Sequence, residues 1–282
     1  MEIVKEKAQI RKIVQEASAT GRTVGLVPTM GFFHQGHLEL MRRARADCDL
    51  VVVTLFVNPT QFTPGEDFAD YPRDFERDRE MAESVGVDYI FNPEVDEMYP
   101  EGFSTHVEVE GLSDILCGAI RPGHFRGVAT VVAKLFNIVP AKRAYFGQKD
   151  AQQLAVIKRM AADLDFPLEV IGVATVREED GLAMSSRNTY LGEQDRADAL
   201  VLSRALSVAA GMIDAGERSA AAVSKAMQGV FNALPSVNLE YIAICDNIYL
   251  RPLSELHGEV LIAVAARVGK ARLIDNMLFE VE

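Results

Sequence analysis

Apolar residues along the chain recur with two spacings, helical and strand-like, which alternate over the first two thirds of the sequence. Apolar positions at helical spacing predict a helix over residues 5–20, which Gly21 ends. The short apolar runs at residues 23–27 and 50–57 are typical of buried parallel strands, and a helical pattern over residues 36–46 lies between them. A strand, a loop, a helix and a strand within roughly 35 residues indicate a βαβ unit.

The alternation continues as far as residue 176 and then changes. The next predicted elements are helix 71–85, strand 88–91, helix 128–138, strand 143–146, helix 150–162 and strand 168–176. Beyond them come two Ala-rich helical patterns and two strands, at residues 194–215, 219–234, 237–246 and 259–268. The sequence therefore predicts an α/β fold: a Rossmann-like, doubly wound parallel sheet over residues 1–176 and a smaller C-terminal α+β domain over residues 177–282.

Length and charge exclude several classes of protein. The 282 residues suffice for one main domain and a smaller one. No apolar run approaches the ~20 residues of a membrane span, and residues 1–15 lack the apolar stretch of a signal peptide, so we expect a cytoplasmic protein without a membrane partner. The net charge of −12 argues against a general nucleic-acid binder, which would carry a basic face. The widely spaced Cys48, Cys117 and Cys245 are typical of reduced, partly buried thiols.

The strongest candidate site follows the first predicted strand, where residues 28–37 read PTMGFFHQGH. Open α/β sheets bind ligands at the carboxyl ends of their strands. Gly31 and Gly36 allow a close approach of the backbone to a ligand, and the start of the next helix attracts an anion. His34 and His37 add two imidazole donors, which favours phosphate binding. Paired histidines can also bind a metal, but no third ligand lies at a familiar spacing.

Two other segments carry groups suited to phosphate. In GLAMSSRN, the hydroxyls of Ser185 and Ser186 precede the Arg187 guanidinium, and the three can hold phosphate oxygens. An ordinary polar loop with a helix cap is the alternative interpretation. In FGQKDAQQ, Lys149 can neutralise phosphate charge, while Asp150 either caps the next helix or holds a ribose hydroxyl.

Two further segments offer groups to a small polar substrate. NPTQF follows the second strand, and its Asn58 and Gln61 can make directional hydrogen bonds. RPGHFRG is a loop that includes Arg121 and His124, and taken alone it is as consistent with a solvated loop as with a site.

The HQGH segment resembles the HxGH signature of the nucleotidyltransferase superfamily that includes the class I aminoacyl-tRNA synthetases, and GLAMSSRN resembles the mobile phosphate-binding loop of the same superfamily. The signature alone does not choose among the members. Together, PTMG, HxGH, NPxQF, YPR, RPxHF, GQKDxQQ and DGLAMSSRN resemble the pantothenate synthetase (pantoate–β-alanine ligase) family over the N-terminal two thirds of the chain. The resemblance implies a homodimer formed through the N-terminal domain, and a C-terminal domain that carries a lid over the ATP site.

The resemblance also implies roles for individual residues. The ATP site would be formed by Met30, Gly31, Phe32, Phe33, His34, Gln35, Gly36, His37, Gly147, Gln148, Lys149, Asp150, Val176, Met184, Ser185, Ser186 and Arg187. The catalytic residues, which stabilise charge at the phosphates, would be His34, His37, Lys149, Ser185, Ser186 and Arg187. Pantoate and β-alanine would be bound by Gln61, Gln153, Asn58, Arg121 and His124. Asp78 falls where the family has an acidic residue near Mg²⁺, but the adjacent Arg77, and the bulky Phe32 and Phe33, depart from the family pattern.

The implied reaction has two steps. The carboxylate of pantoate attacks the α-phosphorus of ATP and displaces pyrophosphate, and the amine of β-alanine then attacks the pantoyl adenylate and releases AMP. Two rival functions remain at this stage. One is an enzyme of the superfamily that transfers a nucleotide to a phosphate, and the other is an ATP-binding module without catalysis.

Overall fold

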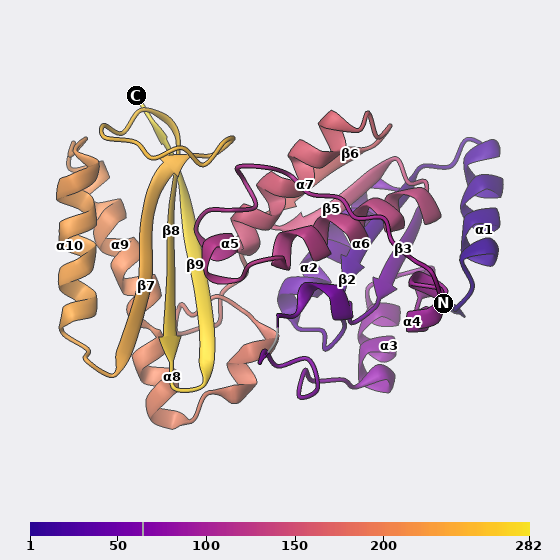
Figure 1. The fold of residues 1–282 in the computed structure, drawn as a ribbon, viewed down its shortest axis with the longest axis horizontal. Helices are drawn as coiled ribbons and strands as arrows, with labels where there is room; N and C mark the ends of the chain where they lie inside the picture. The colour runs from indigo at the N-terminus through magenta and orange to yellow at the C-terminus, as the bar shows by residue number, and fades with distance from the viewer. Residues whose placement is uncertain (64) are drawn as a thin grey trace. The chain divides into compact units, whose positions relative to one another are not determined.

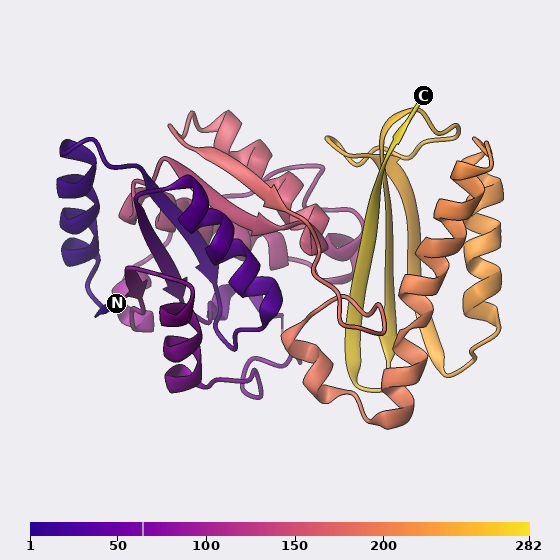
Figure 2. The same ribbon diagram turned by 180° about the vertical axis from the view of Figure 1, so that it is seen from behind.

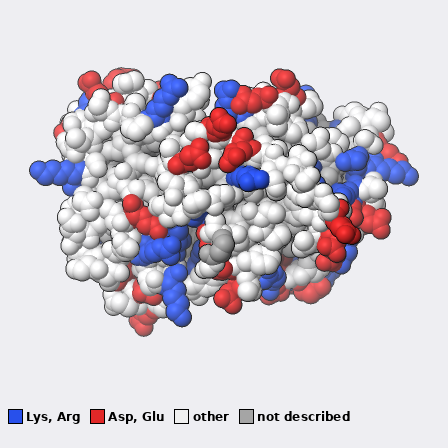
Figure 3. Space-filling model, in the orientation of Figure 1, with Lys and Arg blue, Asp and Glu red and all other residues white. Residues whose placement is uncertain are grey.

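The chain forms two compact units in the computed structural model, which describes residues 1–63 and 65–282. Residues 1–147 and 156–174 make up the first unit, and residues 148–155 and 175–282 the second. Each unit is described by itself. Acidic and basic side chains are interspersed over the face drawn in Figure 3. No helix within the described residues is long and apolar enough to cross a membrane.

The first unit is built on a parallel sheet of six strands. In spatial order these are β1 (Glu2–Val4), β4 (Tyr89–Phe91), β3 (Leu50–Leu55), β2 (Val24–Thr29), β5 (Arg143–Gly147) and β6 (Glu169–Val173). Val52 and Val53 are fully buried, as are Leu26 and Val27 in the neighbouring strand. Continuous apolar strands of this kind are typical of parallel sheets, whose two faces are both covered by the connecting helices.

Helices cover both faces of this sheet. They are α1 (Lys7–Ala19), α2 (Gln35–Asp47), α3 (Phe75–Ser84), α4 (Val95–Met98), α5 (Cys117–Ile120), α6 (His124–Ile138) and α7 (Ala151–Asp163), with the 3₁₀ turn η1 (Pro59–Gln61). The 3₁₀ turn η2 (Gln148–Asp150) belongs to the second unit. Figure 1 shows α6 in front of the sheet, and Figure 2, drawn from behind, shows α2 in front of it. Most of α6 is buried, and its charged residues Arg126 and Lys134 are not among the buried ones.

The second unit combines helices with an antiparallel sheet. Its elements are η3 (Ser186–Tyr190), α8 (Glu193–Ala199), α9 (Val201–Asp214), α10 (Ala220–Asn232), β7 (Val237–Asp246), β8 (Gly258–Val268) and β9 (Ala271–Val281). The strands pair in the order β7-β8-β9. Leu202, Leu206 and Val223 of the helices share one buried apolar core with Val260 and Ile262 of β8.

The predicted α/β fold is confirmed, with corrections to single elements. The helix predicted over residues 194–215 is interrupted at Leu200 and forms α8 and α9, and the helix predicted from residue 71 begins at Phe75. Strands β1 and β9 and the four-residue helices α4 and α5 were not predicted. All three cysteines are free thiols, and they are buried rather than partly buried.

Candidate active site

The strand order reverses at β2, and the carboxyl ends of the strands beside this reversal are where a ligand site is expected. From β2 the chain moves outward through β3 to β4, whereas β5 and β6 extend the sheet on the other side. Ligands of open α/β sheets bind at the carboxyl ends of the strands beside such a reversal. β2 ends at Thr29 and β5 ends at Gly147. Residues 30–37 therefore leave the sheet where a ligand site is expected.

Asp78 holds the turn that follows β2. Its carboxylate, 1% exposed, accepts hydrogen bonds of 2.6 Å from the backbone N–H groups of Phe32 and Phe33. Gly31 has a φ of +88°, and a Cβ there would lie 3.0 Å from Asp78 Oδ2, so the turn favours glycine. Phe32 also has a positive φ of 51°, which a non-glycine residue adopts only where its surroundings hold it. Burial raises the pKa of the Asp78 carboxyl, against the opposing effect of the two N–H groups and of Arg77.

The two phenylalanines that depart from the family pattern have different surroundings. Phe33 is fully buried in the core beside α2, and its ring centroid lies 5.6 Å from that of His37. The ring of Phe32 lies under the Arg77 guanidinium, with 5.1 Å from the ring centroid to Cζ. Arg77, which replaces the expected second acidic residue, therefore packs on this turn.

His34 and His37 are oriented by the backbone at the start of α2. Nδ1 of His34 accepts from the Gly36 N–H at 3.1 Å, and Nδ1 of His37 accepts from the His34 N–H at 3.3 Å. A ring nitrogen that accepts carries no proton, so each neutral ring has its proton on Nε2. The ring centroids lie 4.0 Å apart. The helix start thus carries two adjacent Nε2–H donors.

Asn58 holds Gln61 and is itself fully engaged. Its Nδ2 donates to Gln61 Oε1 at 3.0 Å and to the Gly127 carbonyl at 3.2 Å, while its Oδ1 accepts from the Tyr99 hydroxyl at 2.7 Å. Asn58 is 1% exposed. Nε2 of Gln61 contacts Met30 Sδ at 3.2 Å, a weak acceptor. Gln61 therefore retains donor capacity for a ligand, and Asn58 positions it.

Arg121 and His124 also act on Gln61 through its backbone. His124 Nδ1 lies 2.7 Å from the Gln61 carbonyl, and its Nε2 lies 2.9 Å from Arg121 Nη1. Arg121 makes a two-pronged ion pair with Glu66, at 2.5 and 2.7 Å. Burial opposes ionisation of Glu66, but the hydrogen bonds from Arg121 and from the Thr63 N–H prevail and lower the pKa of Glu66 to about 2. The structure thus gives Arg121 and His124 structural partners within this unit.

In the second unit, β9 holds the turn η2. The Asn276 amide Nδ2 donates to the carbonyls of Gln148 and Lys149 at 2.9 and 2.8 Å. Lys149 Nζ lies 3.7 Å from Asp150 Oδ1. Nε2 of Gln148 and Oδ1 of Asn276 are buried and make no hydrogen bond within the described part of the chain. A buried polar atom without a partner costs about 1–3 kcal/mol, which a polar ligand can recover.

The segment from Val176 to Asn188 is a short hairpin that leads into η3. The Met184 N–H donates to the Val176 carbonyl at 2.9 Å, and Ser185 Oγ accepts from the Arg187 N–H at 3.3 Å. Ser186 is buried. Asn188 Nδ2 donates to Glu178 Oε1 at 2.7 Å. The backbone of this segment is thus fixed by its own residues.

A salt-bridge network anchors the base of the same hairpin. Arg196 of α8 pairs with Glu178 and with Asp180, each at 2.7 Å. Arg177 pairs with Asp275 of β9 through both of its terminal nitrogens, at 2.7 and 3.0 Å. Hydrogen bonding from Arg196 lowers the pKa values of Glu178 and Asp180. The hairpin is therefore tied to α8 and to β9.

Asp78 does not fit a metal site formed by the protein alone. Both of its oxygens accept backbone N–H groups, and no group of three His, Cys, Asp or Glu side chains suited to a metal lies among the residues that the structure describes. The expected role of Asp78 beside Mg²⁺ stays a prediction.

The sequence-predicted residues fall into two sets. The first unit contains Met30, Gly31, Phe32, Phe33, His34, Gln35, Gly36, His37, Asn58, Gln61, Asp78, Arg121, His124 and Gly147. The second contains Gln148, Lys149, Asp150, Gln153, Val176, Met184, Ser185, Ser186 and Arg187. Sequence reasoning missed several supporting residues: Glu66, Tyr99, Arg177, Arg196, Asp275 and Asn276. These act through side-chain contacts across long sequence separations, and no local motif marks them.

Comparisons with known proteins identify relatives over the whole chain. Residues 2–278 match the family model described as pantoate-beta-alanine ligase. A curated pantothenate synthetase of Moorella thermoacetica is 57% identical over 281 residues, covering 100% of this chain and 99% of that protein. A pantothenate synthetase of Heliobacterium modesticaldum is also 57% identical, with full coverage of both chains.

Solved structures give the same result. The crystal structure of pantothenate synthetase from Thermus thermophilus has a TM-score of 0.94 at 50% identity, covering 98% of this chain and 99% of that one. The pantoate-beta-alanine ligase of Francisella tularensis, complexed with beta-gamma ATP and beta-alanine, has a TM-score of 0.79 at 31% identity, covering 99% and 97%.

Proposed function

We propose that this chain, a ligase of the pantoate–β-alanine ligase family, condenses pantoate with β-alanine through a pantoyl adenylate. The carboxylate of pantoate attacks the α-phosphorus of ATP, forming a P–O bond, and pyrophosphate leaves. The amine of β-alanine then attacks the activated carbonyl, and AMP leaves as the amide bond forms.

The first step depends on positioning and on neutralisation of charge. A carboxylate is already a competent nucleophile, so this step needs no general base. The proposed donors to the phosphates are His34, His37, Lys149, Ser185, Ser186 and Arg187.

The observation that carries this proposal is the orientation of the two histidines. Because backbone N–H groups donate to Nδ1 of both rings, each neutral ring carries its proton on Nε2. Both rings are at the start of a helix, after the strand at which the sheet reverses. Preorganised donors in this position suit the charge that develops on a phosphate during displacement.

Gln61 is the central residue in the proposed binding of pantoate and β-alanine. Its Nε2 is placed by Asn58 and by the Arg121–His124 network, so we infer that it contacts pantoate or β-alanine directly. Asn58, Arg121 and His124 then act as positioning residues. Gln153 lies half-buried in the first turn of α7, and its contact with pantoate is part of the proposal.

Product analysis tests the proposal against its rivals. The enzyme is incubated with ATP, Mg²⁺, pantoate and β-alanine, omitting each in turn. We expect AMP, pyrophosphate and pantothenate in quantity only in the complete mixture, and exchange of labelled pyrophosphate into ATP with pantoate but without β-alanine. A product that retains the nucleotide would favour the nucleotidyl-transfer rival, and ATP binding without any pyrophosphate would favour the non-catalytic module.

We also propose a cytoplasmic location and a homodimer, of which the homodimer is supported by the family resemblance alone. Sedimentation velocity across a range of protein concentrations tests the dimer, and a purely monomeric protein would contradict it.

A further inference from the structure

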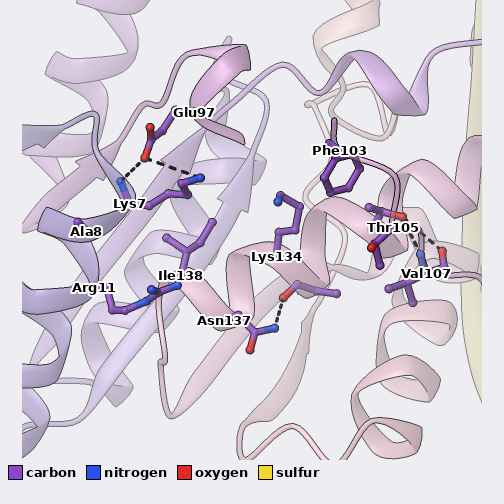
Figure 4. A pocket seen from close by; sticks show the side chains of 12 residues that line it. Lys7, Ala8, Arg11, Glu97, Phe103, Thr105, Val107, Lys134, Asn137 and Ile138 are labelled. Atoms are coloured by element: carbon purple, nitrogen blue, oxygen red, sulfur yellow. Dashed lines mark hydrogen bonds and ion pairs between the residues drawn. The ribbon is translucent and has the colours of Figure 1, made fainter. Parts of the chain in front are cut away.

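A cavity lies in the first unit, formed by residues that the proposed reaction does not use. Its volume is about 590 Å³, and its lining includes Lys7, Arg11, Glu97, Phe103, Lys134 and Ile138. Figure 4 shows these side chains coming from α1, from α4 and the segment after it, and from α6. None of the lining residues is among the candidate active-site residues.

The charge of this cavity is opposite to that of the chain. Three cationic side chains and a single carboxylate line it, whereas the whole chain has a net charge of −12. The carboxylate, Glu97, is already engaged: it accepts from the Lys7 backbone N–H at 2.9 Å and lies 4.0 Å from Lys7 Nζ. Arg11 and Lys134 make no ion pair with any described residue. Two cations therefore remain uncompensated at one cavity.

Lys134 is held in place by aromatic rings rather than by a carboxylate. Its Nζ lies 4.7 Å from the ring centroid of Phe103 and 5.6 Å from that of Tyr99. These contacts favour a charged ammonium and fix its direction. Burial, and after it the charge of Lys7, lower the pKa of Lys134. A bound anion would oppose both effects and stabilise the charged ammonium.

The rest of the lining combines the polar Thr105, Thr130 and Asn137 with apolar side chains. Phe103, Val107, Ala133 and Ile138 contribute hydrocarbon surface beside the cations. A bare inorganic ion would leave this surface exposed to water, whereas an anion with an apolar body would cover it. We propose that this cavity binds a small organic anion, in which a phosphate or carboxylate contacts Arg11 and Lys134 and an apolar group contacts Phe103 and Ile138.

Phenyl phosphate is a suitable probe because it joins a dianion to an aromatic ring. It is titrated into the protein while the methyl resonances of isoleucine are followed by NMR. We expect a saturable shift of Ile138, which lines the cavity, with no shift of Ile262, which is buried in the core of the second unit. Inorganic phosphate should bind about tenfold more weakly, since it lacks the apolar contact.

Substitutions test which side chains bind the probe. Lys134→Met and Arg11→Gln should each weaken phenyl phosphate binding by about tenfold, while Lys134→Arg should retain it. Lys12→Gln is the matched control, because Lys12 lies on the same helix as Arg11 but pairs with Glu16 outside the cavity. An Ile138 resonance that does not move in the wild type, or equal affinity in Lys134→Met and the wild type, would overturn the proposal.

Discussion

At the scale of single residues, the candidate site contains side chains whose acceptor atom is already engaged within the protein. The Nδ1 atoms of His34 and His37 accept from backbone N–H groups, and this fixes Nε2 as the nitrogen that carries the proton in each neutral ring. Gln61 is similar, because Asn58 occupies its Oε1 and leaves Nε2 as the donor. Each of these side chains can in general both donate and accept, and here the engaged acceptor atom leaves a donor at a defined position.

Substituting His37 by alanine removes one of these donors. We expect pantoyl adenylate formation to fall by about 10²- to 10³-fold, because one preorganised donor to the developing charge is lost. Folding should be largely intact, with a stability loss of about 1 kcal/mol for the lost capping-box hydrogen bond from the His34 N–H. Single-turnover measurement of pyrophosphate release gives the rate. Glu39→Gln, on the same helix, is the control, and a near-normal rate in His37→Ala would contradict the assigned role.

Glu66→Gln tests the ion pair with Arg121 through its pH dependence. The pKa of Glu66 lies at about 2 in the folded protein and near its ordinary value of 4.5 when unfolded, so the pair stabilises the fold above pH 4.5 and is lost as the pH falls towards 2. We expect the variant to be about 1–3 kcal/mol less stable at pH 7, with a narrower difference at pH 4.

Urea unfolding of wild type and variant at both pH values measures this difference. The exposed Glu101→Gln provides the comparison for loss of a negative charge alone. A gap between wild type and Glu66→Gln that stays constant from pH 7 to pH 4 would rule out the ion pair as its cause.

At the scale of elements, the hairpin at residues 176–188 is held by charges in addition to Leu182, which belongs to the apolar core of the second unit. Arg177 makes a two-pronged ion pair with Asp275, which is 2% exposed, and Arg196 joins Glu178 to α8. A segment anchored at its base in this way can present Ser185 and Arg187 in a fixed direction. The cost is that removing one partner leaves a buried charge.

Arg177→Met should therefore destabilise the protein by about 3–5 kcal/mol, because Asp275 stays buried without its partner. Adding Asp275→Asn should restore much of that loss, since the neutral amide needs no counter-charge. Chemical unfolding of both single variants and the double variant gives the coupling between the two sites. A loss below about 1 kcal/mol in Arg177→Met would show that the pair contributes little.

The sequence predicted elements that have a clear period, and it failed where the period is short or interrupted. β2, β3 and β8 are continuous apolar runs and were predicted within a few residues. β9 was missed because Asp275 and Asn276 interrupt its apolar pattern, although Gly269 and Lys270 form the two-residue connection typical of a hairpin. β1 has only three residues, too few to show a period.

For the candidate site, the sequence predicted the residue types but not the partners that their polar atoms contact. Asn58, Arg121 and His124 carry the chemistry that a substrate would need, yet their polar atoms contact Tyr99, Glu66 and the Gln61 carbonyl. Those partners lie many residues away along the chain, so only the tertiary structure shows that they engage the predicted groups.

At the scale of the whole molecule, the residues proposed to contact ATP belong to two separate compact units. Residues 30–37 lie in the first unit, and residues 148–150 and 184–187 lie in the second. If both sets bind the same nucleotide, ATP must stabilise both units against local opening. A ligand that binds only the folded state at about 100 times its Kd adds about 2.7 kcal/mol of stability, which corresponds to roughly 100-fold slower exchange of protected amides.

Hydrogen exchange with and without ATP tests this expectation peptide by peptide. We expect slower exchange at residues 30–37 and at residues 184–188, and little change in α10, which carries no proposed ligand contact. The His37→Ala variant should lose part of the protection in both segments, because a shared ligand couples their stabilities. Protection confined to residues 30–37 would mean that the SSRN segment does not contact the nucleotide, and the assignment of Ser185, Ser186 and Arg187 would then be wrong.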